Sequence, residues 1–336
     1  MKILVIQKKF MGDVLVTSTI LPLLKNKFSD SEISFLAEEK HTQILVGNPY
    51  INHFIFFKDS FLKTLSEVKK QKFDIIIDLY SKIETGALTL LSGAKTRIGF
   101  FKNYTQFFYN FPVKRTTKLK SKNTTFGIEH RLQMLEPLGI GFQETFPKIY
   151  LSEEEIENAH RILSENGLAI DDNLIMLSTF GSSKEKTYPT EYMAEVIKFI
   201  FQCKPNSKLL CNYMPFQEDL FEELYNQLSE DVKKLVIKNF HTKSLREFAA
   251  VTSLCKCLIG NEGGATNVSK SLKIPTLTIF SPQIKLEDWA WTSNSKMDRF
   301  LHVKDFVPNS ESYSDFTPNY IEKGLKEFLD KTISQE

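Results

Sequence analysis

Two groups of residues, far apart in the chain, have side chains and spacing suited to chemistry. The first group is Glu262, Gly263 and Gly264, which follow a short apolar segment at 257–259 and precede a predicted helix. Glycines let a ligand approach the backbone, and the first turn of a helix presents N–H groups and partial positive charge to a phosphate. The Glu262 carboxylate could accept hydrogen bonds from a sugar. In the alternative interpretation, this segment is an ordinary strand–helix–strand crossover whose glycines only permit a tight turn.

Asp13 is the second candidate. It follows the first predicted strand, residues 2–7, and lies just before a predicted helix at 14–27. Open α/β sheets bind ligands at the carboxyl ends of their strands, so a carboxylate there could serve as a general base. Asp13 could instead cap the helix, and both roles could hold together.

A third polar segment, residues 178–189, lies between a predicted strand and a predicted helix. Gly181 and Ser182 offer backbone and hydroxyl donors to phosphate oxygens, and Lys186 adds a mobile positive charge. For Lys184 we prefer a solvated surface lysine, which is also the alternative for Lys186.

These loops connect strands and helices that alternate along the chain. The continuous apolar character of residues 73–79 is typical of a central parallel strand. Strands are predicted at 2–7, 33–37, 53–57, 73–79, 96–100, 174–178, 209–212, 235–237, 257–259 and 274–280, and the main helices at 14–27, 61–70, 153–165, 191–201 and 318–331. This alternation predicts an α/β protein with parallel, doubly wound sheets.

The chain has 336 residues, a length that predicts about two domains. Residues 139–147 resemble a linker, after which the alternation restarts. We therefore expect one Rossmann-like domain at 1–145 and a second at 146–315. The remaining residues, 316–336, are predicted as a helix that packs back toward the first domain.

Several classes are disfavoured. The loop after the first strand, residues 7–13, has one glycine, so the G-x-G-x-x-G fingerprint of a nicotinamide dehydrogenase is missing, and no P-loop occurs. The four cysteines form no C-x-x-C pair and are expected to be reduced. No signal peptide and no run of about 18 apolar residues is present, so we expect a cytoplasmic protein.

Charge is distributed unevenly. Residues 1–150 contain 22 Lys+Arg against 13 Asp+Glu, whereas residues 151–336 contain 21 against 28. The first half includes a basic run without acidic residues: Lys114, Arg115, Lys118, Lys120 and Lys122. This run could bind an anionic acceptor or lipid head groups, or it could be a solvated loop. It is not interleaved with aromatic residues, so nucleic acid is not expected.

The sequence resembles glycosyltransferase family 9, the lipopolysaccharide heptosyltransferases. The similar segments are Met11-Gly12-Asp13-Val14-Leu15, Arg97-Ile98-Gly99-Phe100, Glu129-His130-Arg131, Lys186-Thr187-Tyr188-Pro189, Gly260-Asn261-Glu262-Gly263-Gly264, Pro275 and Phe280-Ser281-Pro282. The resemblance extends over nearly the whole chain, with its motifs in the order and spacing of that family.

The resemblance implies a GT-B fold, in which two Rossmann-like domains face each other across a cleft. It also implies an inverting glycosyltransferase that needs no metal and no cofactor, and that moves heptose from ADP-heptose to a lipopolysaccharide core or related glycan. Asp13 would be the catalytic base. The donor phosphates and sugar would meet Gly181, Ser182, Lys186, Glu262, Gly263, Gly264 and Asn267, the nucleoside would meet Met214 and Gln217, and the acceptor would meet Gly12, Lys114, Arg115, Lys118 and Lys120. The partners would be a nucleotide sugar, an anionic glycolipid and, peripherally, the inner face of the cytoplasmic membrane.

Some positions depart from the family pattern. The family usually has Asp at the position of Glu262, a hydroxyl residue at Gly263, His at Asn267, Trp at Tyr188, and an acid at Gln217. The donor could therefore be another nucleotide sugar. A non-catalytic protein that binds nucleotide sugars is the other alternative.

Overall fold

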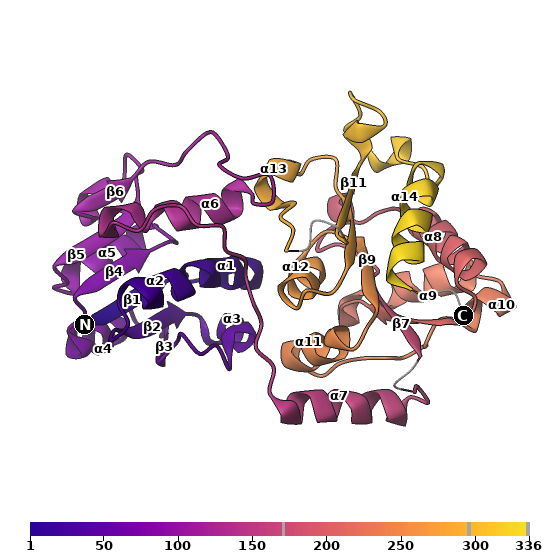
Figure 1. Ribbon diagram of the computed structural model, residues 1–336, viewed down its shortest axis with the longest axis horizontal. Helices are drawn as coiled ribbons and strands as arrows, with labels where there is room; N and C mark the ends of the chain where they lie inside the picture. The colour runs from indigo at the N-terminus through magenta and orange to yellow at the C-terminus, as the bar shows by residue number, and fades with distance from the viewer. Residues whose placement is uncertain (170–171, 294–296, 334–336) are drawn as a thin grey trace. The chain divides into compact units, whose positions relative to one another are not determined.

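The computed structural model describes residues 1–169, 172–293 and 297–333, and its backbone divides into two compact units (Figure 1). The units are Met1–Tyr150 and Leu151–Glu336, a division close to the one predicted from the sequence. Each unit contains one parallel sheet with helices packed on it, as the alternation of strands and helices predicted.

The first unit is built on a six-stranded sheet with the order β3-β2-β1-β4-β5-β6, in which every neighbouring pair is parallel. The strand order is that of a doubly wound dinucleotide-binding fold, although the glycine fingerprint is absent. Its elements are β1 (Lys2–Ile6), α1 (Met11–Thr17), η1 (Ser18–Ile20), α2 (Leu21–Lys27), β2 (Glu32–Ala37), α3 (Glu39–Thr42), η2 (Gln43–Leu45), β3 (His53–Phe56), α4 (Phe61–Gln71), β4 (Ile75–Asp78), α5 (Ile83–Leu91), β5 (Thr96–Phe100), η3 (Gln106–Phe108), β6 (Phe111–Val113), α6 (Phe126–Gln133) and η4 (Glu136–Leu138).

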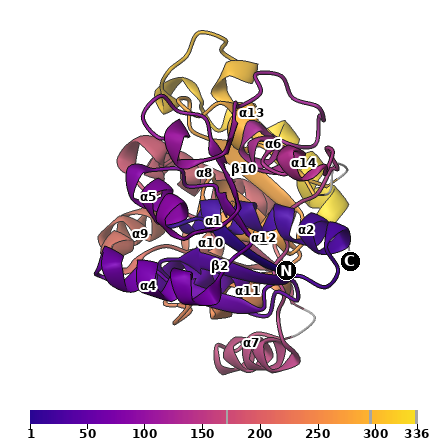
Figure 2. The ribbon, with the colours of Figure 1, turned by 90° about the vertical axis from the view of Figure 1, so that its left-hand side faces the viewer.

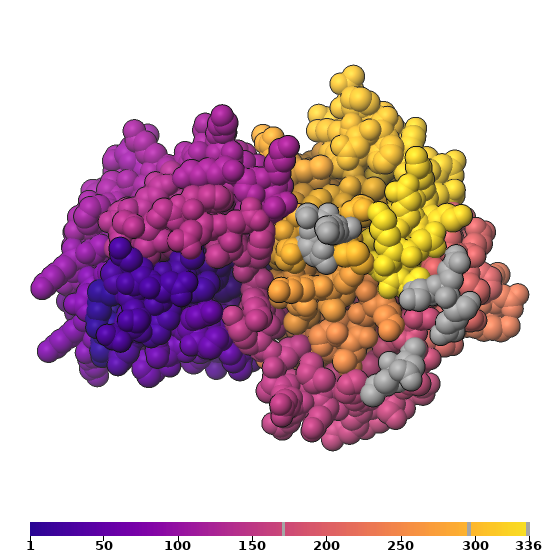
Figure 3. All heavy atoms as spheres, viewed as in Figure 1, coloured from indigo at the N-terminus to yellow at the C-terminus, as the bar shows by residue number. Residues whose placement is uncertain are grey.

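The second unit is built on a five-stranded parallel sheet with the order β11-β10-β9-β7-β8. Figure 3 shows α7, its first helix, at the surface of this unit. Its elements are α7 (Glu153–Glu165), β7 (Asn173–Ser178), η5 (Lys184–Lys186), α8 (Thr190–Cys203), β8 (Ser207–Asn212), η6 (Pro215–Gln217), α9 (Glu218–Asn226), α10 (Glu230–Lys233), α11 (Leu245–Ser253), β9 (Cys257–Asn261), α12 (Gly264–Ser271), β10 (Thr276–Phe280), α13 (Leu286–Trp289), β11 (Arg299–His302), η7 (Val303–Asp305), η8 (Tyr313–Asp315) and α14 (Asn319–Thr332).

Each sheet has one point at which the strand order reverses direction. In the first sheet it lies between β1 and β4, and in the second between β7 and β9. Loops that leave the carboxyl ends of two such strands diverge, and the space between them is where open α/β sheets bind their ligands. The loops that carry the candidate site residues therefore leave each sheet at the place where ligand binding is expected.

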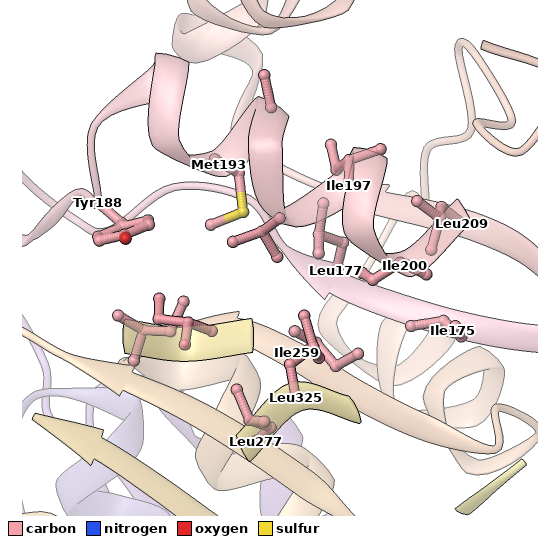
Figure 4. Close-up of a cluster of buried hydrophobic side chains, with 14 of the residues drawn as sticks. Ile175, Leu177, Tyr188, Met193, Ile197, Ile200, Leu209, Ile259, Leu277 and Leu325 are labelled. Atoms are coloured by element: carbon pink, nitrogen blue, oxygen red, sulfur yellow. The ribbon is translucent and has the colours of Figure 1, made fainter. Parts of the chain in front are cut away.

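Buried aliphatic side chains hold the helices of the second unit on its sheet (Figure 4). Ile197 and Ile200 of α8 pack toward Ile175 and Leu177 of β7, and all four are fully buried. Burying each such side chain contributes about 1.5–3 kcal/mol, so this layer keeps the loops after β7 and β9 in fixed register.

The last helix, α14, belongs to this same core. Ile321, Leu325, Phe328 and Leu329 form its buried face, and the helix packs against α8 and β11. We predicted that residues 316–336 pack toward the first domain. In the described residues, the apolar face of the helix is instead buried within the second unit.

Two local predictions differ from the structure. The helix predicted at 14–27 is divided by η1, where the hydroxyls of Ser18 and Thr19 donate to the carbonyls of Leu15 and Val16. Such bonds bend helices. Residues 235–237 form a single bridge between Val236 and Leu209 instead of a strand. The short strands β6 and β11 were not predicted.

Candidate active site

In the first unit, Asp13 lies in the opening turn of α1, directly after β1. Its carboxylate is 28% exposed, and Oδ1 accepts a hydrogen bond from Nη2 of Arg131 at 2.6 Å. The N-cap of α1 is Phe10, which makes no side-chain capping bond. Asp13 is therefore held in a partly buried ion pair that leaves part of the carboxylate open to a ligand.

Arg131 comes from α6, which packs beside α1 and η1 (Figures 1 and 2). Its guanidinium also donates from Nε to the Thr17 hydroxyl at 3.0 Å and from Nη1 to the Gly127 carbonyl. Burial lowers the pKa of Arg131, and the charge of Asp13 opposes that shift. A guanidinium bonded on three sides has one orientation, so it fixes the position of Asp13.

A second carboxylate, Asp78, ends β4 on the other side of the same switch point. It is fully buried and accepts bonds from the Tyr109 hydroxyl and the Ser81 N–H, both at 2.8 Å. Burial raises the pKa of Asp78 to about 6. Lys102 closes the cluster by donating from Nζ to the Ser81 carbonyl at 2.7 Å. The end of the apolar run at 73–79 was the only sequence signal for this cluster.

The basic run at 114–122 is bound to α6. The Glu129 carboxylate, 2% exposed at residue level, accepts from the N–H groups of Lys120 and Ser121 and from the Thr124 hydroxyl. Lys120 also pairs with Glu136, with Nζ 3.1 Å from Oε1. These contacts attach the backbone of the run to α6, while its five basic residues are all exposed.

Within the same run, Lys114 and Arg115 lie over the rings of Phe101 and Phe100, at 5.0 and 4.4 Å from the ring centroids. Burial lowers the pKa of Arg115, and the charge of Asp13 opposes the shift. Arg115 therefore lies within electrostatic reach of the predicted base. Lys118 is exposed and its carbonyl accepts from the Thr116 hydroxyl, while Gly12 is half-buried beside Asp13.

In the second unit, Asn261 ties the two loops of the switch point together. Its Nδ2 donates to the carbonyls of Ser178 and Thr179 at 3.1 and 2.8 Å, and its Oδ1 accepts from the Tyr188 N–H at 2.7 Å. The side chain is fully buried at the end of β9. Because Asn261 bonds to both ends of the 179–188 loop, it fixes that loop against the turn that holds Glu262.

This arrangement brings Lys186 and Glu262 together. Lys186 Nζ lies 3.7 Å from Glu262 Oε1, with side-chain exposures of 42% and 12%. Burial raises the pKa of Glu262, and the nearby Lys186 charge lowers it. The pair thus presents one accessible cation beside one largely buried carboxylate.

Gly263 and Gly264 lead directly from this carboxylate into α12. Gly263 has φ 154° and serves as the N-cap, a conformation that L side chains rarely adopt. The first-turn N–H groups of a helix have no intrahelical acceptors, so they can bind an anion. Asn267 lies one turn further on, where its Oδ1 accepts from Trp291 Nε1 at 3.1 Å. Its amide oxygen is therefore already engaged.

The loops after β7 and β8 hold residues that are predicted to contact the phosphates and the nucleoside. These two loops lie side by side. Gln217 Nε2 donates to the Gly181 carbonyl at 3.0 Å, and Gln217 Oε1 accepts from the Met214 N–H at 2.9 Å. A Cβ at Gly181 would lie 2.2 Å from the Lys186 carbonyl, so only glycine fits this loop. Ser182 is exposed and Met214 is 56% exposed. Phe216, which lies between Met214 and Gln217 in the chain, is 76% exposed.

No cluster of three or more His, Cys, Asp or Glu side chains suited to a metal ion occurs in the residues that the structure describes. Within the same part of the chain, none of the helices combines the length and apolar character that crossing a bilayer requires.

Comparison with known proteins identifies the family of this chain. The family model described as "Glycosyltransferase family 9 (heptosyltransferase)" matches residues 61–302. A lipopolysaccharide heptosyltransferase 1 of Campylobacter coli is 25% identical over 300 residues, covering 83% of this chain and 84% of the relative.

Solved structures give the same result for the fold. A family 9 glycosyltransferase of Veillonella parvula superposes with a TM-score of 0.80 at 22% identity, covering 98% of this chain and 97% of that one. The ADP-heptose lipopolysaccharide heptosyltransferase II of E. coli superposes with a TM-score of 0.76 at 16% identity, covering 98% and 99%. Both support the GT-B fold with two parallel-sheet domains. With its family model matched over most of its length, this chain belongs to glycosyltransferase family 9, the heptosyltransferases, and is a glycosyltransferase.

Proposed function

We propose that this glycosyltransferase moves a heptose from ADP-heptose to the anionic core of lipopolysaccharide or a related glycan, with inversion at the anomeric carbon. The observation that carries the proposal is the Lys186–Glu262 pair, 3.7 Å apart, at the amino end of α12. One cation, one carboxylate and a helix N-terminus are what a sugar diphosphate requires. The donor identity rests on the ADP-heptose enzyme among the structural relatives.

In the reaction, an acceptor hydroxyl attacks the anomeric carbon of the donor. Its oxygen forms a bond to that carbon while the bond to the diphosphate oxygen breaks, and the electron pair leaves with the nucleoside diphosphate. Asp13, whose side chain is 28% exposed, accepts the hydroxyl proton. General-base assistance of this kind contributes about 10²–10⁴-fold to the rate.

The departing diphosphate gains negative charge. Lys186 provides a positive charge and three N–H donors, and the first turn of α12 provides oriented backbone N–H groups. These groups are the basis for proposing that the reaction requires no divalent metal. Glu262 lies beside Lys186, where its carboxylate can accept hydrogen bonds from hydroxyls of the donor sugar.

The acceptor is proposed to bind the first unit near Arg115, whose charge interacts with that of Asp13. An anionic sugar would compensate the basic residues there, including Lys114 and Lys102. Because such acceptors are lipid-anchored, we also propose peripheral contact with the inner face of the cytoplasmic membrane.

A different nucleotide sugar is the second candidate donor. The longer side chain of Glu262 and the engagement of Asn267 with Trp291 both favour it, because they alter the surroundings of the donor sugar. A thermal-shift panel of nucleoside diphosphate sugars separates the candidates, since the preferred donor raises the melting temperature most.

Turnover is then measured with the stabilising donor and deacylated core oligosaccharide, and the anomeric configuration of the product is read by NMR. We expect stabilisation by ADP-heptose and an inverted product. Stabilisation by another sugar nucleotide with transfer would favour the second donor. Binding without transfer to any core acceptor, or a product with retained configuration, would contradict the proposed reaction.

A further inference from the structure

Helix α5 is apolar on both faces although it lies at the outside of the first unit (Figure 2). Its inner face includes Leu88, which is fully buried, whereas Ile83, Leu90 and Leu91 on the outer face are 61%, 40% and 46% exposed. Spacings of seven and eight residues place those three on one stripe. A helix that is apolar all round is normally buried, so the outer stripe indicates contact with something apolar.

The short helix η3 extends this stripe. The ring of Phe108 lies against Gly86 in the middle of α5, where an added Cβ would be 2.3 Å from the ring. Phe107 is tilted against Phe108, with ring centroids 4.2 Å apart, and is 64% exposed. We call Ile83, Leu90, Leu91 and Phe107 the α5 patch.

The chain around the α5 patch is strongly basic. Between Asp78 and Glu129 it carries nine Lys and Arg residues and one acidic residue, Glu84, which is paired with Lys8. Lys82 and Lys95 are exposed at the two ends of α5. Exposed apolar side chains ringed by lysines match an anionic lipid surface, which accepts the apolar groups and attracts the cations.

We propose that the α5 patch inserts into the head-group region of an anionic lipid monolayer. A second copy of the chain is a poorer occupant, because it would bring two equally basic surroundings face to face. Ile83, the first residue of the patch, follows β4 at the sheet edge that also holds Asp13, whereas Leu90 and Leu91 lie at the far end of α5. Resting on the proposed function, insertion at the Ile83 end would bring a lipid-anchored acceptor toward the base.

The test is sedimentation of the full chain with vesicles of phosphatidylglycerol and phosphatidylcholine in equal parts, beside vesicles of phosphatidylcholine alone. The test variant is F107S/L91S, and the control is F216S, which removes an aromatic ring of similar exposure (76% against 64% for Phe107) from the acidic second unit. Unfolding curves check that each variant is folded. No donor or acceptor is present, so the result is independent of sugar transfer.

We expect wild type and F216S to bind the anionic vesicles and to be released by salt, and F107S/L91S to bind at least roughly tenfold more weakly. Equal binding by F107S/L91S and wild type would overturn the proposal, as would equal binding to neutral vesicles. Absence of vesicle binding together with self-association that F107S/L91S abolishes would assign the patch to a second copy instead.

Discussion

The guanidinium of Arg131 and the carboxylate of Asp13 are 118 residues apart in sequence and 2.6 Å apart in the fold. Arg131 touches the carboxylate with one nitrogen and is bound by Thr17 and Gly127 with the others. Arg131 therefore fixes the orientation of Asp13 through one carboxylate oxygen, and the exposed part of the carboxylate stays available to an acceptor hydroxyl.

If Arg131 positions the base, R131K will lower kcat roughly ten- to hundredfold and leave the KM for the donor unchanged, because the donor residues lie elsewhere. Guanidinium ion added to R131A should restore part of the activity. Steady-state kinetics with R161A as the exposed-arginine control would show this. A loss fully explained by unfolded protein, without rescue, would mean that Arg131 only stabilises the fold.

Asp13 itself is tested with D13N, which keeps the shape of the side chain and removes its basicity. Transfer should fall about 10²–10⁴-fold, while the donor still raises the melting temperature as it does for wild type. D30N, at an exposed aspartate of the same unit, serves as the control. Transfer by D13N at the wild-type rate would rule out Asp13 as the base.

Lys186 is expected to bind the donor diphosphate. K186A should weaken nucleoside diphosphate binding roughly ten- to hundredfold, as expected for losing a hydrogen bond to a charged group. Isothermal titration against K184A, which removes an exposed lysine of the same loop, isolates the effect. Equal affinities of K186A and K184A would show that the cation does not contact the phosphates.

Gly260 allows β7 and β9 to approach closely at the switch point of the second sheet. Its φ is +133°, and a Cβ would lie 2.3 Å from the Ser178 carbonyl oxygen. G260A should therefore lower the free energy of unfolding by about 2–4 kcal/mol. Urea unfolding would measure this beside G141A, where a Cβ meets nothing within 4 Å. Equal stability of the two variants would refute the steric explanation.

Asp78 makes the stability of the fold depend on pH. Its pKa in the folded protein, about 6, lies above the ordinary 3.8, so the folded state binds an extra proton between those values. The stability it contributes is complete below about pH 4 and is lost as the pH rises through 6. From pH 5 to pH 8, wild type should lose roughly 1–2 kcal/mol that D78N retains.

Urea unfolding at both pH values measures this difference, with D74N, an exposed aspartate just before β4, as the control. Parallel pH dependence of wild type and D78N would show that Asp78 does not titrate in this range.

The amino-acid sequence by itself determined the fold class, the approximate domain boundary and the loops that carry the candidate site. The apolar run at 73–79 and the glycine turn at 263–264 can be recognised from the sequence, because the residues of each segment are enough to predict its strand or turn. The exact position of the domain boundary and the division of the predicted helix at η1 were not predicted, because both depend on contacts that form only when the chain folds.

Only the tertiary structure decided which side chains meet. The partner of Asp13 is on α6, the partner of Glu262 is in the loop after β7, and Tyr109 bonds to Asp78 from beyond β5. Each of these contacts joins residues that only strand order and helix packing bring together. The short edge strands β6 and β11 were missed for the same reason, because pairing with a neighbouring strand, more than local preference, stabilises them.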